Sequence, residues 1–287
     1  MVLVVLLITG LLAGTVAALA ASRYPHGGSH PRPGAGRLSA RLDPEAATGL
    51  ALTLALVVLV GGGLLLAVLA FVLRSDPDAI GLDAGAANWA SRHRTATETD
   101  VLEVISYVGR PGSIIVLAAL LAVVETVRTR SRWVVPFLFL VVAGNGILTT
   151  TIKELADRVR PALNPVAATL GPSFPSGHSS WSAAFFAAAA LLLARGRGRR
   201  GRIVLAGLAV GIAVTIAATR VLLDVHWLSD VVAGLALGWA WFAACAIAFG
   251  GRLLRFGAEA EALGARDGAA GGYDAGTSSA GEPQRVS

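Results

Sequence analysis

The sequence has little of what a soluble, a disulfide-bonded or a thiolate metal-binding protein needs. Charged residues make up only 15% of the 287 residues, whereas hydrophobic residues make up 55%. The mean hydropathy is positive, and a soluble domain rarely combines these values. The single cysteine, Cys245, lies in an apolar run, so neither a disulfide framework nor a thiolate metal site is available. We therefore expect an integral membrane protein.

Lysine is almost absent from the chain. Of the 24 basic residues only Lys153 is a lysine, and all the others are arginine. The net charge of +6 does not indicate a nucleic-acid-binding protein, because the arginines gather in short loops between apolar segments. Arginines in that arrangement indicate membrane topology. The one position that keeps a lysine is therefore of interest.

Long apolar runs are abundant. A helix that spans a bilayer needs roughly 20 apolar residues. Seven stretches meet or approach that length: residues 2–21, 48–73, 112–127, 134–151, 179–194, 203–219 and 229–249. We expect the two short ones, 112–127 and 179–194, to continue as helix into polar sequence. The predicted fold class is all-α, a polytopic transmembrane helix bundle.

Arginine-rich loops orient this bundle. Three such loops lie on the same side if all seven segments span: residues 23–46, 128–132 and 195–202. Short basic loops stay in the cytoplasm, so we expect these loops and the C-terminus inside. The loops that then face outward are 74–111, 151–178 and 220–228. The predicted localisation is the plasma membrane, with several spans.

The flanking segments are interpreted separately. Residues 2–21 end like a secretion signal, but no basic residues precede the apolar run, and cleavage would invert every later loop. We expect residues 1–22 to be an uncleaved additional transmembrane helix. Residues 23–47 read as a cytoplasmic Pro/Gly-rich linker with solvated His26 and His30. Residues 251–287 read as a disordered cytoplasmic tail.

Three polar clusters fall in the outward loops. In the first, "KELADRVRP", Lys153 and Arg160 are seven residues apart. A helix would place them on nearly one face, about 10 Å apart along its axis, and Pro161 would end that helix. The two cations either bind an anion or extend to the lipid headgroups. Arg158 is expected to point elsewhere, as a surface charge.

The second cluster, "GPSFPSGHSSW", is a tight turn that leads into an apolar helix. Ser176, Gly177 and His178 lie where that helix begins, and free N–H groups at a helix start favour an anion. Gly177 permits close backbone approach, and His178 can donate a proton near neutral pH. The alternative is an ordinary helix start capped by Ser176 or Ser179.

The third cluster lies in "ATRVLLDVHWLSDVVAG". Asp230 is four residues after His226 and hence on the same helical face. A carboxylate that holds one imidazole N–H leaves the other nitrogen more nucleophilic. Arg220 adds a cation, and Asp224 is expected to cap the helix. The alternative is a structural ion network among Arg220, His226 and Asp230, although charges near a membrane tend to be functional.

Together the clusters offer three cations, a helix start, two histidines and one carboxylate. This inventory suits a phosphoryl group, whose transfer requires the charge on its oxygens to be neutralised. A two-metal site would need several clustered carboxylates, which the sequence does not show. We therefore expect no metal and no other cofactor.

The three clusters resemble the three-part signature of the type-2 phosphatidic acid phosphatase superfamily, which also includes vanadium-dependent haloperoxidases. The residues that carry the resemblance are Lys153-x6-Arg160-Pro161, Pro175-Ser176-Gly177-His178 and Arg220-x5-His226-x3-Asp230. It covers residues 48–250 and implies a six-helix phosphatase core there, to which segment 1–22 adds one N-terminal helix. Thr219 departs from the family pattern, which usually has serine, but it keeps the hydroxyl.

The resemblance also implies roles for these residues. His226 would be the nucleophile that forms a phosphohistidine, Asp230 would orient it, and His178 would protonate the leaving oxygen. The phosphate oxygens would be bound by Lys153, Arg160, Ser176, Gly177 and Arg220. The spacing of the residues alone only favours His226 over His178 as the attacking group.

The sequence thus predicts a metal-independent membrane phosphatase with an extracytoplasmic site. Its partners would be the bilayer and a lipid phosphate or pyrophosphate, such as undecaprenyl pyrophosphate, phosphatidic acid or phosphatidylglycerol phosphate. The alternative is a non-catalytic protein that binds or transports a lipid phosphate. Seven apolar segments argue against a haloperoxidase. Loop 74–111 is expected to shape access, and Trp89, Arg92, His93 and Arg94 in it are consistent with an interfacial helix.

Overall fold

The computed structural model describes residues 1–23, 47–76, 81–161 and 171–253, and within these ranges every regular element is a helix. Seven segments are long and apolar enough to cross a membrane: Val2–Ala21, Leu54–Ser75, Pro111–Thr129, Val134–Ala156, Gly177–Ala194, Arg199–Leu222 and Leu228–Phe249. They coincide with the seven predicted spans, and both short spans extend beyond their predicted ends. The predicted fold class, an all-α transmembrane bundle, is confirmed.

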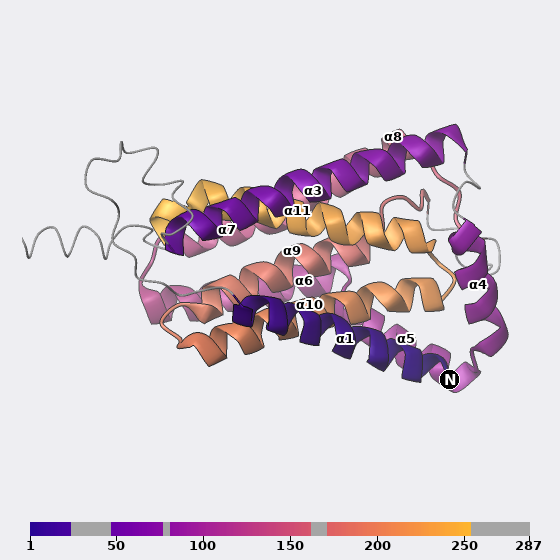
Figure 1. Ribbon diagram of the computed structural model, residues 1–287, viewed down its shortest axis with the longest axis horizontal. Coiled ribbons are helices and arrows are strands. Elements are labelled where there is room, and N and C mark those ends of the chain that lie inside the picture. The colour runs from indigo at the N-terminus through magenta and orange to yellow at the C-terminus, as the bar shows by residue number, and fades with distance from the viewer. Residues whose placement is uncertain (24–46, 77–80, 162–170, 254–287) are drawn as a thin grey trace, which may run out of the picture.

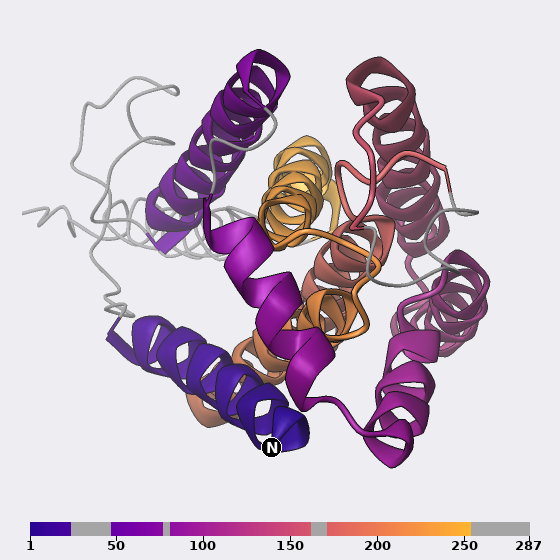
Figure 2. The same ribbon diagram turned by 90° about the vertical axis from the view of Figure 1, so that its right-hand side faces the viewer.

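The spanning helices lie side by side along one axis (Figure 1). They are α1 (Val2–Arg23), α3 (Ala47–Ser75), α6 (Pro111–Thr129), α9 (Gly177–Ala194), α10 (Arg199–Leu222) and α11 (Leu228–Leu253). The remaining span joins α7 (Val134–Phe139), a π-helical turn (Leu140–Gly144) and α8 (Asn145–Ala156). Two short helices, α4 (Gly81–His93) and α5 (Ala96–Val108), precede α6. Figure 2 shows α4 lying across one end of the bundle.

Helix α9 packs closely against α10 and α11. Its inward face carries small residues, among them Ser179, Ser180 and Ala183, which are buried. On α11, a methyl group added at Gly234 would lie 2.4 Å from the carbonyl oxygen of Ser176. Small residues let two helix backbones approach in this way. The α9–α11 contact therefore fixes the start of one helix against the start of the other.

The additional N-terminal helix α1 packs against α10. Gly14 of α1 and Gly207 of α10 face each other, because a methyl group added at either would lie 2.9 Å from the carbonyl oxygen of the other. The outer faces of the bundle carry exposed apolar side chains, such as Leu11, Leu64 and Phe71. In water such surfaces would be a liability, whereas in a bilayer they contact lipid.

Two predictions about segments meet different outcomes. Residues 81–93, which include Trp89, Arg92 and His93, do form a helix, α4. The predicted helix from Lys153 to Arg160 is wrong, because α8 ends at Ala156. Asp157 then adopts a left-handed conformation with φ of 42°, and its N–H bonds to the carbonyl of Lys153 at 3.0 Å. The chain therefore turns before Pro161 can end the helix.

The predicted linker, residues 23–47, and the predicted tail, residues 251–287, lie almost entirely outside the described residues. His26 and His30 belong to that part of the chain.

Candidate active site

Lys153 and Arg160 meet at the turn that precedes α9. Lys153 Nζ donates to the carbonyl of Pro172 at 2.7 Å, and Arg160 Nη2 donates to the same oxygen at 3.2 Å. Arg160 Nε also donates to the carbonyl of Gly171 at 2.8 Å. The two cations do not share a helical face as predicted, but the chain turn at Asp157 still brings them to one carbonyl oxygen.

The start of α9 is fixed by α11 rather than by a capping side chain. Ser176 is the N-cap residue, but its hydroxyl makes no capping bond and instead accepts from Ser179 Oγ at 3.0 Å. The N–H of Ser176 donates to the carbonyl of Asp230 at 2.9 Å. A methyl group added at Gly177 would find only Thr149 Cγ2, at 3.9 Å. The first turn, whose N–H groups lack intrahelical acceptors, is thus uncrowded at Gly177.

His226 lies between a carboxylate and a guanidinium. Its Nδ1 is 3.4 Å from Asp230 Oδ2, and its Nε2 is 3.1 Å from Arg160 Nη1. An arginine can only donate, so Nε2 must present its lone pair, and Nδ1 then carries the proton that faces the carboxylate. Asp230 Oδ2 is held in turn by the N–H of Trp227 at 3.0 Å. This arrangement selects the tautomer whose free nitrogen faces the cations.

The imidazole of His226 is 3% exposed. Burial lowers the pKa of His226 to about 4, against the opposing effect of Asp230, and the charges of Arg160 and Arg220 lower it further. The ring is therefore neutral near pH 7, as a nucleophile must be.

Arg220 and His178 complete the set. Arg220 Nη1 donates to Ser106 Oγ of α5 at 2.6 Å. Among the described residues, Arg220 Nε and His178 Nε2 are buried side-chain atoms without a hydrogen-bond partner. His178 lies within electrostatic reach of Arg220, His226 and Arg160. Two buried polar atoms without partners are a costly arrangement unless a ligand satisfies them.

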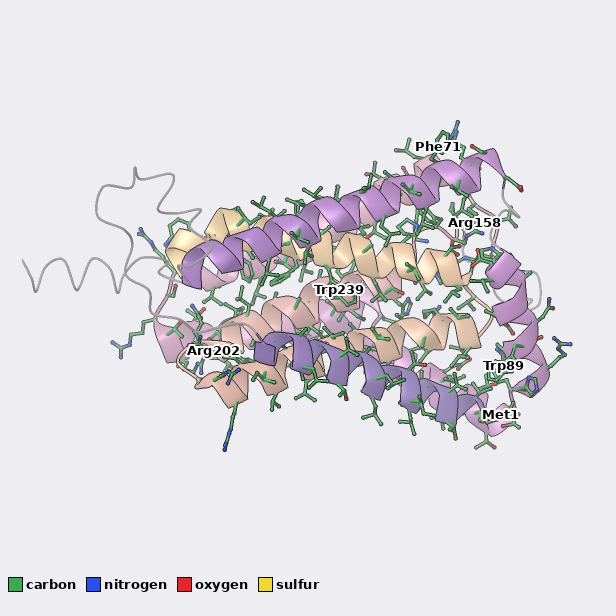
Figure 3. All side chains as sticks on the ribbon, in the orientation of Figure 1. Met1, Phe71, Trp89, Arg158, Arg202 and Trp239 are labelled. Carbon is green, nitrogen blue, oxygen red and sulfur yellow. The ribbon has the colours of Figure 1, made fainter. Side chains whose placement is uncertain are left out.

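Arg158 was predicted to be a surface charge, and this prediction is wrong. Its side chain is 9% exposed, and its Nη1 lies 2.6 Å from Asp230 Oδ1 while its Nη2 lies 2.9 Å from Asp83 Oδ2. The cause is the early end of α8, because the chain reverses at Asp157 and carries Arg158 inward. Figure 3 shows Arg158 at the α4 end of the bundle. Sequence spacing gave no signal for Asp83, which lies more than 70 residues before its partner.

Asp224 was predicted to cap a helix, and this prediction is also wrong. Asp224 has a φ of 54° and precedes α11 by four residues. Its buried carboxylate lies 3.0 Å from Arg94 Nη1. Burial raises the pKa of Asp224, and Arg94 opposes that shift. Arg94 also donates to the carbonyl of Leu222, so it holds the loop between Arg220 and His226 rather than lying free at an interface.

The structure thus gathers the predicted site residues at one end of the bundle. Three cations and the first turn of α9 can neutralise a phosphate, and a neutral imidazole backed by a carboxylate can attack it. In the described ranges, no group of three His, Cys, Asp or Glu side chains is placed to hold a metal ion.

Comparison with known proteins agrees with this geometry. Residues 134–253 match the family model described as the PAP2 superfamily. Over this segment the chain resembles the PAP2 superfamily. The recognition made from the three motifs is confirmed. Every predicted PAP2 site residue, from Lys153 to Asp230, lies inside the matched segment. Asp83, Arg94 and Ser106, which hold Arg158, Asp224 and Arg220, lie outside it.

Several PAP2-like relatives have known activities. The chain is 35% identical over 133 residues to a lipid A 1-phosphatase of Rhizobium johnstonii, and the aligned stretch covers 41% of this chain and 50% of the relative. It is 32% identical over 114 residues to phosphatidylglycerophosphatase B of Bacillus subtilis, over 38% of this chain and 55% of the relative. A decaprenylphosphoryl-5-phosphoribose phosphatase of Mycobacterium tuberculosis is 34% identical over 131 residues, with coverages of 42% and 64%. The chain thus spans about half the length of the first of these relatives.

A solved PAP2 structure extends the likeness to more of the fold. The crystal structure of the transmembrane PAP2-type phosphatidylglycerolphosphate phosphatase from Bacillus subtilis aligns with a TM-score of 0.61 at 25% identity. The alignment covers 69% of this chain and 98% of that one. The PAP2 fold therefore reaches well beyond the segment that the family model matches.

Proposed function

We propose that the protein is an integral membrane phosphatase that hydrolyses a lipid phosphate or pyrophosphate through a phosphohistidine intermediate. The observation that carries this proposal is the placement of His226. Its buried, neutral imidazole has Asp230 at Nδ1 and Arg160 at Nε2. A pocket that only bound an anion would need the cations but not an oriented imidazole.

The reaction divides into two displacements. His226 Nε2 attacks phosphorus as the bond to the lipid oxygen breaks, and His178 gives a proton to that leaving oxygen. Water then attacks the phosphohistidine, His178 takes a proton from that water, and inorganic phosphate leaves as His226 is restored. Lys153, Arg160, Arg220 and the first turn of α9 with Ser176 and Gly177 bind the phosphate oxygens. Arg160 exchanges its contact with His226 for one with phosphate.

The position of the site supports the proposed substrate class. The site residues lie at the ends of spanning helices, where the headgroup of a lipid lies when its chains remain in the bilayer. The relatives described above act on lipid A, on phosphatidylglycerophosphate and on decaprenylphosphoryl-5-phosphoribose. A lipid phosphate or pyrophosphate of the extracytoplasmic leaflet is therefore the proposed substrate, with undecaprenyl pyrophosphate, phosphatidic acid and phosphatidylglycerol phosphate as candidates.

The experiment is a phosphate-release panel over isoprenoid and glycerolipid phosphates with purified protein and its His226→Ala variant. Wild type should release phosphate from at least one lipid and form an acid-labile phosphoprotein. His226→Ala should bind that lipid with the wild-type Kd but release no phosphate, because only the nucleophile is lost. Arg202→Gln, at the opposite end of the bundle (Figure 3), is the control and should behave as wild type.

Two outcomes would contradict the proposal. Full phosphate release by His226→Ala would exclude His226 as the nucleophile. Wild-type protein that binds lipid phosphates but releases phosphate from none would favour the binding or transport alternative.

A further inference from the structure

Arg158 lies at the centre of a buried charge cluster that joins three parts of the chain. Its Nη1 lies 2.6 Å from Asp230 Oδ1 and donates to Ser229 Oγ at 2.7 Å, while its Nη2 lies 2.9 Å from Asp83 Oδ2. Its guanidinium lies over the ring of Trp227, 5.5 Å from the centroid. The cluster links the segment after α8, the start of α11 and helix α4. Arg158 is therefore held on several sides. One of its partners is Asp230, the carboxylate that faces the proposed nucleophile His226.

The two oxygens of Asp230 have different partners. Oδ1 faces Arg158, whereas Oδ2 faces His226 Nδ1 and accepts from the N–H of Trp227. A carboxylate is free to rotate about its last side-chain bond unless both oxygens are held. Because Arg158 holds Oδ1, Oδ2 is kept toward the imidazole. The orientation of His226 thus depends on a residue that does not touch it.

Asp83 holds Arg158 in this position. It is 4% exposed, and its Oδ1 accepts the N–H of Ser229 at 2.8 Å while its Oδ2 accepts from Ser229 Oγ and Arg158. A buried carboxylate of this kind is stable only when it is paired and hydrogen-bonded. Asp83 therefore fixes both Arg158 and the first turn of α11, in which Asp230 lies.

We propose that Arg158, held by Asp83, is a positioning residue that fixes the carboxylate of Asp230 and thereby sets the orientation and the proton affinity of His226. The proposal rests on the proposed function, because it assigns a role in the reaction of that site. The side chains of Arg158 and Asp83 bond to Ser229, to Asp230 and to each other rather than to the cations that would bind phosphate. Its effect should therefore appear in kcat rather than in KM.

The charged groups around His226 determine the expected pH effect. They are Asp230 on α11, Arg160 after α8, Arg220 on α10 and, as a second imidazole, His178 on α9. In wild type, Arg158 partly offsets the negative charge of Asp230. Its removal leaves that charge to act on His226 alone, and a nearby negative charge favours the protonated imidazole. The acid limb of kcat/KM should therefore move to higher pH in Arg158→Gln.

The test uses two substitutions at Arg158 that separate geometry from charge. Arg158→Gln removes both the charge and the bidentate guanidinium. We expect kcat to fall by about 100-fold, the scale of a misplaced catalytic group, while KM stays near wild type. The acid limb of kcat/KM should move to higher pH. Arg158→Lys keeps the charge but not the bidentate geometry. It should lose kcat while its acid limb stays close to wild type. Asp83→Asn should resemble Arg158→Gln, and the double variant should be no worse than the Arg158 single variant.

A matched control lies at the opposite end of the bundle. Glu125 is buried and pairs with Arg195 at 3.0 Å and with Arg128 at 2.9 Å, so Arg195→Gln also breaks a buried ion pair. It should lower the unfolding temperature without changing kcat per folded molecule or the acid limb. The positioning role would be wrong if Arg158→Gln, like Arg195→Gln, only reduced the fraction of folded protein. It would also be wrong if Arg158→Gln raised KM and left kcat unchanged.

A second readout does not depend on turnover. The protein has five histidines, and in ¹⁵N-histidine-labelled protein the His226 signal is the one that His226→Gln removes. Wild type should show Nδ1 protonated and Nε2 free, and Arg158→Gln should show a higher titration midpoint for that ring. An unchanged midpoint and tautomer would overturn the proposal. Absence of phosphatase activity in wild type with the expected NMR shift would instead count against the proposed function alone.

Discussion

At the scale of the residue, burial decides which form His226 takes. The ring is enclosed by α10, α11 and the segment after α8, and water cannot stabilise its charged form there. Asp230 favours the protonated ring but is itself engaged by Arg158, so burial prevails. A neutral imidazole next to fixed cations is suited to attack phosphorus, whereas a protonated one would have no lone pair at Nε2.

This argument predicts the pH dependence of the reaction. Burial lowers the pKa of His226 from 6.5 to about 4, so the unprotonated form is complete above pH 6.5 and is lost only as the pH falls through about 4. The acid limb of kcat/KM, which reports the free enzyme, should lie near pH 4. A ³¹P titration of the substrate in the same detergent separates its own ionisation. A limb near 6.5 that the substrate does not share would contradict the prediction.

Fixed cations also predict the response to chelators. Lys153, Arg160 and Arg220 supply three positive charges at the site, which is the charge neutralisation that phosphoryl transfer needs. Phosphatase activity should therefore persist after dialysis against EDTA, and millimolar vanadate, which mimics pentacoordinate phosphorus, should inhibit it. Loss of activity in EDTA that Mg²⁺ restores would show that a metal ion is required.

The motif residues could be predicted from the sequence because the residue types and the spacing within each of the three motifs indicate their chemistry. The positions of Arg158 and Asp224 could not be predicted, and the same reason applies to both. Each is paired with a residue distant in sequence, Asp83 for Arg158 and Arg94 for Asp224. Local spacing suggested a surface charge and a helix cap, and only the packing of α4 over the end of the bundle shows otherwise.

At the scale of the element, hydropathy determined the spans but not their ends. Apolar length is a local property, so all seven spans were predictable. The end of α8 was not predictable, because residues 147–160, which lead up to Pro161, contain no glycine and no proline. Asp157 nevertheless adopts the left-handed conformation there. Arg158 and Arg160 form hydrogen bonds to distant segments, and these bonds compensate for the unfavourable backbone conformation of Asp157.

The contact between α9 and α11 predicts that Gly234→Ala is damaging. The added methyl group would lie 2.4 Å from Ser176 O and 2.9 Å from Ser179 Cβ, and the first of these is backbone that must shift. Overpacking of this kind destabilises by about 1–3 kcal/mol. It would also stretch the bond from Ser176 N–H to Asp230 O, so the unfolding temperature and kcat should both fall.

Gly63→Ala is the matched control for this change. Gly63 lies in the spanning helix α3, and nothing lies within 4 Å of the position of an added methyl group. Alanine favours helix over glycine by about 1 kcal/mol, so the unfolding temperature in detergent should stay the same or rise slightly, with kcat unchanged. If both variants behaved alike, close packing at Gly234 would not be the cause.

At the scale of the whole molecule, charge is distributed unequally between the two ends. At the site end, two arginines pair with acidic residues: Arg94 with Asp224, and Arg158 with Asp83 and Asp230. The other end carries the loop 195–202, which contains five arginines and no acidic residue. Figure 3 shows Arg202 at this end and Arg158 at the other. Short loops rich in arginine are retained in the cytoplasm.

This asymmetry predicts that the site faces away from the cytoplasm, and two glycines allow a direct test. Gly85 in α4 and Gly198 beside α10 are exposed, and an added side chain at either meets nothing within 4 Å. Gly85→Cys and Gly198→Cys can therefore be made in a Cys245→Ala background without steric conflict. In intact spheroplasts a membrane-impermeant maleimide should label Gly85→Cys at once and Gly198→Cys only after permeabilisation. The reverse pattern would place the site in the cytoplasm and would restrict the substrates to lipids of the inner leaflet.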